Sequence, residues 1–355
     1  MKLAISLFFA LIVTVLFILA LRPVALAIGL VDTPGGRKQH KKPTPVVGGI
    51  AMYFGFIFGA IFLGYTTTFS ALIMGGALLI GVGAIDDRFD LAPTVRLIAQ
   101  ACAALIMVYV TDIQIHNLGA PLFFTWQLGA FSVPFTILVT LTVINAFNTI
   151  DGIDGLSGGV AFIVLGFMAS FSFNSSILSL TLLLMVIISG FLVCNIPIHS
   201  NRHAKCFMGD AGSTFVGFSV AYLGILLSQG EMASMSPVTG LWLVAVPIYD
   251  VFTSMFRRIF RGKSPFKPDR YHLHHILMDS GLSAKMTLSS ILLLTCITAI
   301  IGSVGEIFIV KDGIMFLSWI SLGVLYYGQI VFYKGQNIIN VINKIRSKAI
   351  FLRLI

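Results

Sequence analysis

The sequence predicts an all-α, polytopic membrane protein with about eleven transmembrane helices. Of its 355 residues, 57% are hydrophobic and only 10% are charged, whereas soluble domains carry about 25% charged residues. So few charges could not cover the surface of a water-soluble protein of this length. The mean hydropathy of +0.97 also excludes an intrinsically disordered chain.

Hydrophobic windows follow one another from the N-terminus to about residue 334, and each spanning helix needs about 20 apolar residues. We expect a single transmembrane domain over residues 1–334 and a basic amphipathic cytoplasmic tail over 335–355. Pro247, inside one span, indicates a bent helix. The predicted spans are residues 3–30, 46–66, 69–86, 94–111, 132–149, 157–173, 177–196, 211–229, 238–256, 287–305 and 312–334.

Charged residues predict the orientation of these spans. When the loops are assigned alternately to two faces, nearly all of the 23 Lys and Arg residues fall on one face, which is then cytosolic. An odd number of spans puts the N-terminus outside and the C-terminus inside. Most aspartates and histidines share the basic face. We therefore expect the active site at the cytosolic ends of the spans.

Asp86 and Asp87 end the third predicted span. Two adjacent carboxylates at a helix C-terminus are unfavourable, because the helix dipole is negative there. A bound divalent metal would compensate them, and so would a neighbouring arginine, Arg88 or Arg96. The motif alone leaves both alternatives open.

Four polar residues, Asn145, Asn148, Asp151 and Asp154, follow at intervals of three. On a helix this spacing places them along one face, and the glycines that follow the aspartates allow close approach of a ligand to the backbone. The alternative is a helix break with solvated aspartates. Four polar residues in register at a membrane boundary favour a functional site.

Two further segments carry polar residues at span ends. Phe207 and Asp210 precede the span at 211–229, where a single aspartate is more simply a helix N-cap than a ligand. Asn195 ends the span at 177–196, and it fits a membrane boundary as well as it fits a ligand contact.

The cytosolic loop at residues 257–285 is basic and contains His272, His274 and His275 beside Arg270. Imidazoles among cations suit anionic oxygens, and a zinc site is disfavoured because neither cysteine nor glutamate accompanies the histidines. Binding of lipid headgroups would explain the cations but not the histidines. A smaller basic loop containing Lys41 fits an anchor or a site equally.

Carboxylates that hold a divalent cation, together with basic loops, indicate a Mg²⁺–diphosphate substrate. The chain has no Walker A or dinucleotide fingerprint, which disfavours an ATP-driven pump or an NAD enzyme. A transporter of anionic solutes is a distant alternative, because the ionisable groups lie at span ends rather than near the middle of the membrane. No nucleic-acid partner is expected.

In this order, the four motifs resemble those of the polyprenyl-phosphate N-acetylhexosamine-1-phosphate transferases. Residues 31–34, 86–90 and 264–270 are most similar to the branch that uses UDP-N-acetylglucosamine and undecaprenyl phosphate. The histidines at 272–275 are interrupted by a leucine, which departs from the three consecutive histidines of the muramyl-pentapeptide branch. The resemblance extends over nearly the whole chain.

The resemblance implies a multi-pass enzyme of the bacterial inner membrane that moves a sugar 1-phosphate from a UDP-sugar to a lipid phosphate and releases UMP. Its implied partners are UDP-N-acetylglucosamine and undecaprenyl phosphate, its cofactor is Mg²⁺ with Mn²⁺ as the alternative, and its product would begin O antigen or a related envelope glycan. Another UDP-N-acetylhexosamine or UDP-muramyl-pentapeptide remains an alternative donor, and a homodimer remains open.

The resemblance also implies residue roles. Asp210 and Asn148 would bind the metal, and Phe207 would stack on uracil near Asn195 and Asp154. The implied catalytic residues are Asp86, Asp87 and Asp151, and the other implied substrate-binding residues are Lys41, Arg270, His272, His274 and His275.

Physical chemistry qualifies the role of the aspartate pair. A phosphate monoester has a second pKa near 6, so removing a proton from the lipid phosphate offers little rate gain. Bringing this dianion to a diphosphate at about 4 Å costs several kcal/mol in a partly dry site. We therefore expect Asp86 and Asp87 to act first by position and charge, and only second as a base.

Overall fold

The computed structural model describes residues 1–33, 43–197, 203–264 and 271–351. Lys41 and Arg270 lie outside the described residues, so their roles stay predictions. The elements in chain order are α1 (Lys2–Ile28), β1 (Val31–Asp32), β2 (Thr44–Pro45), α2 (Gly48–Leu63), α3 (Ser70–Phe89), α4 (Pro93–Thr111), η1 (Gly129–Phe131), α5 (Ser132–Ile150), α6 (Leu156–Ser170), α7 (Ser175–Asn195), α8 (Gly209–Ser228), η2 (Gly230–Met232), α9 (Pro237–Leu243), α10 (Ala245–Phe260), α11 (Leu273–Asp279), α12 (Ala284–Ile307) and α13 (Asp312–Phe351).

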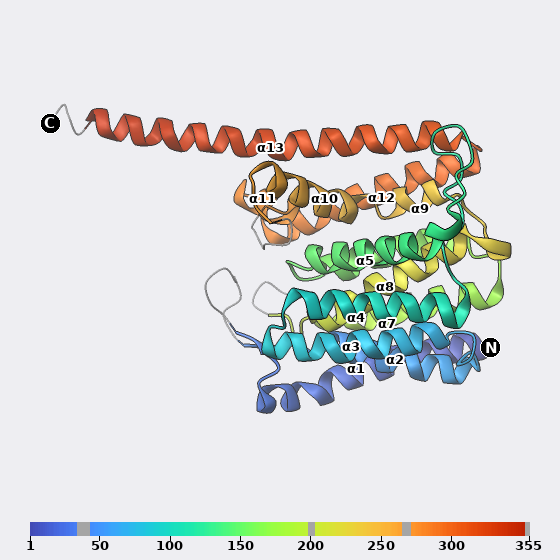
Figure 1. The fold of residues 1–355 in the computed structure, drawn as a ribbon. Helices are drawn as coiled ribbons and strands as arrows, with labels where there is room; N and C mark the ends of the chain where they lie inside the picture. The colour runs from blue at the N-terminus through green and yellow to red at the C-terminus, as the bar shows by residue number, and fades with distance from the viewer. Residues whose placement is uncertain (34–42, 198–202, 265–270, 352–355) are drawn as a thin grey trace.

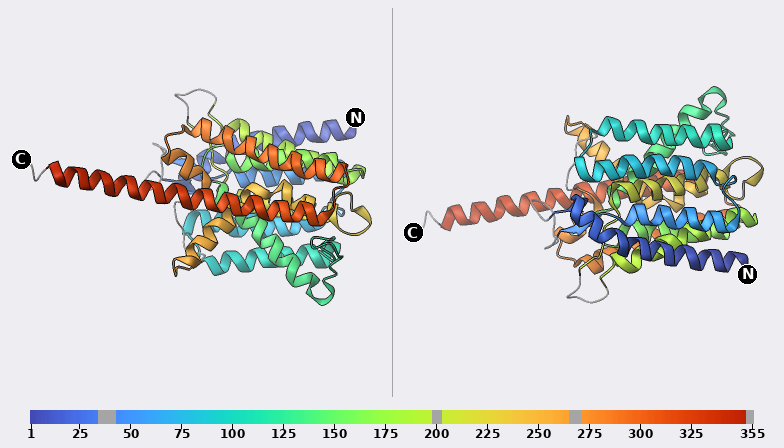
Figure 2. Two further views of the ribbon diagram at one scale, coloured as in Figure 1. Left: turned by 90° about the horizontal axis from the view of Figure 1, so that it is seen from above. Right: turned by 90° about the horizontal axis from the view of Figure 1, so that it is seen from below.

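The long helices run side by side in one bundle, and the N-terminus lies at the end opposite to that from which α13 projects (Figure 1, Figure 2). Strands β1 and β2 form a small antiparallel pair, with Val31 opposite Pro45, at the end from which α13 projects. The predicted tail at 335–355 is helical through Phe351 as a continuation of α13. Its contact with the membrane surface stays a prediction.

Each predicted span coincides with a helix or a helix pair. Among the described residues, eight helices are long and apolar enough to cross a membrane, while α2 and α6 are shorter apolar helices. The bend expected from Pro247 is confirmed, since α9 and α10 meet at an angle of 79°. Proline has no N–H to donate to the carbonyl of Leu243 and its ring clashes there, so the helix breaks at Val244.

Helix α8 lies at the centre of the bundle. Of its most apolar 18-residue stretch, 83% is buried inside the bundle, whereas only 6% of the corresponding stretch of α13 is buried. Helix α8 packs on α2, α3, α5 and α6. Small residues allow this close packing. A Cβ atom at Gly83 would clash with the Cα of Ala211, and one at Gly49 would clash with the backbone of Gly212. The first turn of α8 is thereby held directly against the backbones of α2 and α3.

Substitution of Gly83 by alanine tests this contact. The added methyl would meet the α8 backbone, and overpacking of this kind typically costs about 1–3 kcal/mol. Gly81→Ala is the matched control, because nothing lies within 4 Å of a Cβ at that position of the same helix. In detergent, thermal unfolding should show a lower Tm for Gly83→Ala and an unchanged or slightly higher Tm for Gly81→Ala. Equal Tm values for the two variants would contradict the packing described here.

Candidate active site

Three helix ends meet at the end of the bundle from which α13 projects. The C-terminal ends of α3 and α5 and the N-terminal end of α8 border a cleft of about 750 Å³. Its polar lining combines carboxylates and an amide that are distant in sequence. The predicted site residues that line it are Asp87, Asn148, Asp151, Asp154, Asn195, Phe207, Asp210 and His275.

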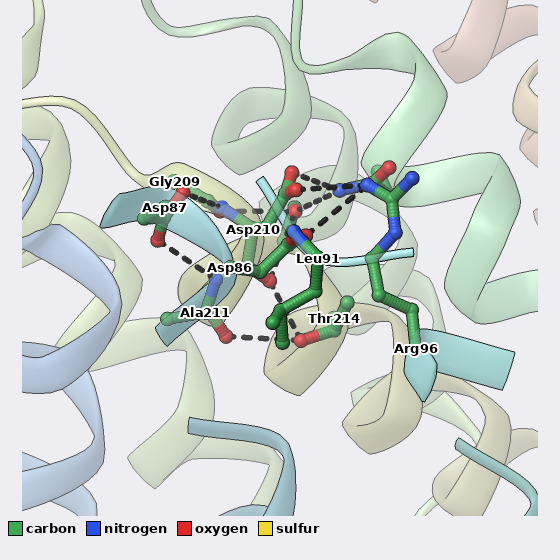
Figure 3. Close-up of polar contacts among 10 residues, drawn as sticks. Asp86, Asp87, Leu91, Arg96, Gly209, Asp210, Ala211 and Thr214 are labelled. Atoms are coloured by element: carbon green, nitrogen blue, oxygen red, sulfur yellow. Dashed lines mark hydrogen bonds and ion pairs between the residues drawn. The ribbon is translucent and has the colours of Figure 1, made fainter. Parts of the chain in front are cut away.

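Asp87 caps helix α8 from the neighbouring helix α3 (Figure 3). Its Oδ1 accepts the backbone N–H of Asp210 at 2.7 Å, and its Oδ2 accepts that of Ala211 at 3.2 Å. Met208, at the N-cap position, provides no side-chain cap. The carboxylate thus accepts hydrogen bonds from N–H groups that have no acceptor within α8, and it faces the positive end of the α8 dipole.

The N-cap prediction for Asp210 is therefore wrong. Asp210 lies within the first turn of α8, and its own amide is one of the groups that Asp87 caps. Gly209 precedes it with φ +73°, and a side chain at this position would collide with Val46 and crowd Asp87. Glycine adopts this left-handed backbone at little cost, which lets the carboxylate of Asp87 reach the helix.

Asp86 lies beside Asp87 but makes different contacts. It is only 4% exposed, and it accepts hydrogen bonds from the backbone N–H of Leu91 at 2.7 Å and from Nη1 of Arg96 at 3.1 Å. Of the two arginines that the sequence offered, Arg96 is the partner. The unfavourable carboxylate pair is thus compensated by a guanidinium on one side and by helix amides on the other.

Arg96 also connects the aspartate pair to Asp210. The same Nη1 lies 3.3 Å from Oδ2 of Asp210, while Oδ1 of Asp210 accepts Nδ2 of Asn148 at 2.6 Å. Asn148 also donates to the hydroxyl of Ser213 at 2.9 Å. The side chain of Asp210 remains about one-third exposed and faces the cleft. The two residues predicted to bind a metal therefore lie in direct contact.

The prediction that four residues at intervals of three share one helix face is wrong. Helix α5 ends at Ile150, so Asp151 and Asp154 lie in the turn that leads to α6, where Gly155 has φ +80°. Asn145 donates instead to Oε1 of Gln100 on α4 at 2.7 Å. Gly155 is the N-cap residue of α6, and the turn before it brings both aspartates to the cleft.

Asp151 lies close to three other carboxylates. Burial, together with the negative charges of Asp210, Asp87 and Asp154, raises the pKa of its carboxyl to about 8. These effects favour the protonated form of Asp151 at neutral pH. A cation that enters the cleft would oppose this effect.

Asn195 and Phe207 are fixed in the cleft wall by backbone contacts. The buried amide of Asn195 accepts the N–H of Gly155 at 2.6 Å and donates to the carbonyl of Cys206 at 3.0 Å. Phe207 donates its N–H to Pro45 and accepts that of Gly48. Asn195 thus ties the aspartate turn to the segment that carries Phe207.

The three histidines of the basic loop occupy different positions. His275 lines the cleft, whereas His274 is 2% exposed and packs on Gly152. His272 is buried against Asp250, with Nδ1 2.8 Å from Oδ2. Burial lowers the pKa of His274 to about 3, so its ring is neutral at physiological pH. Direct contact of His272 and His274 with a substrate stays a prediction.

Several residues that the predicted site did not include lie at or behind the cleft. Arg96 is the guanidinium that compensates the aspartate pair. Lys285 and His203 line the cleft, and no feature of the sequence distinguishes them from the other basic residues. Asp250 had a signal, because it is a lone carboxylate inside an apolar predicted span.

The long apolar helices and the cleft lined by carboxylates at their ends define a class of helical membrane protein with an acidic site. The family model described as glycosyl transferase family 4 matches residues 69–228, from the start of α3 to the end of α8. The chain is also similar over most of its length to curated undecaprenyl-phosphate alpha-N-acetylglucosaminyl 1-phosphate transferases. The chain therefore belongs to glycosyl transferase family 4.

Three of these relatives come from different bacteria. The protein of Salmonella typhi is 38% identical over 299 residues, which cover 82% of this chain and 80% of the relative. That of Yersinia pestis is 35% identical over 319 residues, covering 88% and 87%. That of Haemophilus influenzae is 36% identical over 321 residues, covering 88% and 89%.

The raised pKa of Asp151 predicts a pH-dependent stability. Between about pH 4 and pH 8 the folded state binds this proton more tightly than the unfolded state, so this group makes stability fall as pH rises. Asp151→Asn removes the effect, and its Tm relative to the wild type should rise steadily from pH 5 to pH 8 in EDTA. Asp112 is an exposed carboxylate at the end of α4, and Asp112→Asn is the control. A Tm difference that does not change with pH would contradict the assignment.

Proposed function

We propose that the protein transfers N-acetylglucosamine 1-phosphate from UDP-N-acetylglucosamine to undecaprenyl phosphate and releases UMP. The observation that carries the proposal is the cleft at the helix ends, where Asp87, Asn148, Asp151 and Asp210 converge. Such a cleft lets a lipid phosphate in the bilayer meet a water-soluble nucleotide. The names of the relatives support the same substrates.

In this reaction an oxygen of the lipid phosphate attacks the β-phosphorus of the donor. A new P–O bond forms, the bond between that phosphorus and the bridging oxygen breaks, and UMP leaves with the bridging oxygen. The main barrier is the approach of two anions, so catalysis consists largely of positioning and charge stabilisation. Arg96 supplies a fixed positive charge between Asp86 and Asp210.

The oxygen-rich lining fits Mg²⁺. Among the described residues no three His, Cys, Asp or Glu side chains form a metal-binding group, but Mg²⁺ is usually held by one or two carboxylates together with substrate phosphates. Asp210 and Asn148 would hold the ion, with Mn²⁺ as the alternative. When bound, it supplies positive charge that neutralises the diphosphate.

The contacts of the aspartate pair support a positioning role. The oxygens of Asp87 accept two helix amides, and those of Asp86 accept one amide and one guanidinium N–H. These contacts hold both carboxylates at fixed positions. Asp87 holds α8, and with it Asp210, at a fixed place on the cleft wall.

We further propose eleven membrane spans in the bacterial inner membrane, with the N-terminus outside and with the cleft and the C-terminal tail in the cytosol. The asymmetric distribution of Lys and Arg supports this orientation. The product would be the first lipid-linked intermediate of O antigen or a related glycan. UDP-muramyl-pentapeptide and other UDP-N-acetylhexosamines are the competing donors, and a homodimer is compatible with the proposal.

The donor is tested with purified protein, undecaprenyl phosphate and a panel of radiolabelled UDP-sugars, with UMP release as the readout. UDP-N-acetylglucosamine should be turned over and UDP-glucose should not, because a site that hydrogen-bonds the acetamido group rejects a donor that lacks it. Comparable turnover of UDP-glucose would overturn the hexosamine assignment. Efficient turnover of UDP-muramyl-pentapeptide would assign the chain to the other branch.

The metal role is tested by Asp210→Asn. Loss of a strong electrostatic stabiliser should lower kcat/KM by at least ~10²-fold, and higher Mg²⁺ should recover part of the loss by mass action. Asp90→Asn is a matched control from the same cytosolic cluster, since asparagine tolerates the left-handed backbone at position 90. Near-normal activity of Asp210→Asn at low Mg²⁺ would remove Asp210 from the metal site.

A further inference from the structure

Asp250 on α10 is a buried carboxylate in a largely apolar helix. It is 2% exposed, and its cost of burial must be offset by hydrogen bonds. Its Oδ2 lies 2.8 Å from Nδ1 of His272. Its Oδ1 accepts the N–H of Leu273 at 2.8 Å and the hydroxyl of Tyr326 at 3.0 Å. One carboxylate therefore connects α10, α11 and α13.

The contact with Asp250 fixes the tautomer of His272. An ionised carboxylate can only accept hydrogen bonds, so Nδ1 carries the proton and donates a hydrogen bond to Oδ2. Ser254 also lies near, with its hydroxyl 3.2 Å from the same nitrogen. The contact thus fixes the orientation of the imidazole ring through Nδ1. In this arrangement an aspartate orients a histidine without taking its proton.

His272 is the first of three imidazoles that lead to the cleft. Its ring centroid lies 6.0 Å from that of His274, which lies 4.1 Å from that of His275. Neither ring nitrogen of His274 has a hydrogen-bond partner in the described part of the chain. Asp250 therefore holds the first imidazole of this row, and the same carboxylate also accepts the first amide of α11.

We propose that Asp250 is a positioning residue, which acts through His272 to hold the histidine row of α11 against the cleft. Tyr326 extends this restraint to α13, a helix at the edge of the bundle. The inference rests on the proposed function for its kinetic test. A role in stability alone would predict that Asp250 matters equally whether or not His272 is present.

Asp250→Asn separates the contact made by Oδ2 from the two contacts made by Oδ1. Its Oδ1 can still accept from Leu273 and Tyr326, whereas its NH₂ group faces Nδ1 of His272 and forces the other tautomer. With UMP release as the readout, kcat should fall by ~10-fold or more with a smaller change in KM. In the His272→Ala background the same substitution should change kcat by less than about 2-fold, because the two residues act as one unit.

Ser254→Ala is the matched control, since it removes the other group near Nδ1 from the same helix; it should leave kcat within about 2-fold of the wild type. Equal losses from Asp250→Asn in both backgrounds would overturn the proposal, and so would a Ser254→Ala loss as large as that of Asp250→Asn.

A second readout does not depend on turnover. In protein labelled with ¹⁵N-histidine, the signal that disappears in His272→Ala should report a protonated Nδ1 in the wild type and the other tautomer in Asp250→Asn. An unchanged tautomer in Asp250→Asn would contradict the proposal even if the wild type released no UMP. Wild-type inactivity towards every UDP-sugar would instead count against the proposed function alone.

Discussion

The contact between Asp87 and the first amides of α8 is the interaction on which the site depends. It joins the negative C-terminal end of α3 to the positive N-terminal end of α8, so the two helix dipoles compensate each other. Close packing at Gly83 brings the two helix ends within reach. Asp210 then faces the cleft from the turn that Asp87 holds, next to Asn148 and within reach of Arg96.

The same device occurs twice in this protein. Helix α11 also begins without a side-chain cap of its own, and Asp250 of α10 accepts its first amide, as Asp87 of α3 does for α8. In both cases the helix that receives the cap carries predicted site residues. A carboxylate from a neighbouring helix of the bundle fixes such a helix end in place, which suits a site whose chemistry depends on positioning.

Much of the fold could be predicted from the sequence, because the length of an apolar stretch and the effect of Pro247 on its own helix are local properties of the chain. The positions of the apolar helices and the bend between α9 and α10 required no knowledge of tertiary contacts. The choice of Arg96 over Arg88, and of Asp87 rather than Asp210 as the group that caps α8, depended on which helix ends meet in space. The spacing of Asn145, Asn148, Asp151 and Asp154 was misleading, because it continues across the end of α5.

The most direct test of the account is the pH–rate profile of Asp87→Asn beside that of Asp86→Asn. A residue that acts by capping and charge should give a loss of activity that stays nearly constant from about pH 6.5 to 9. If the residue were a general base, the activity of its Asn variant should recover progressively at higher pH, because the lipid phosphate then loses its proton without help. A constant deficit in both variants is the predicted result, and a steep recovery of Asp87→Asn at high pH would contradict the central role of the helix cap.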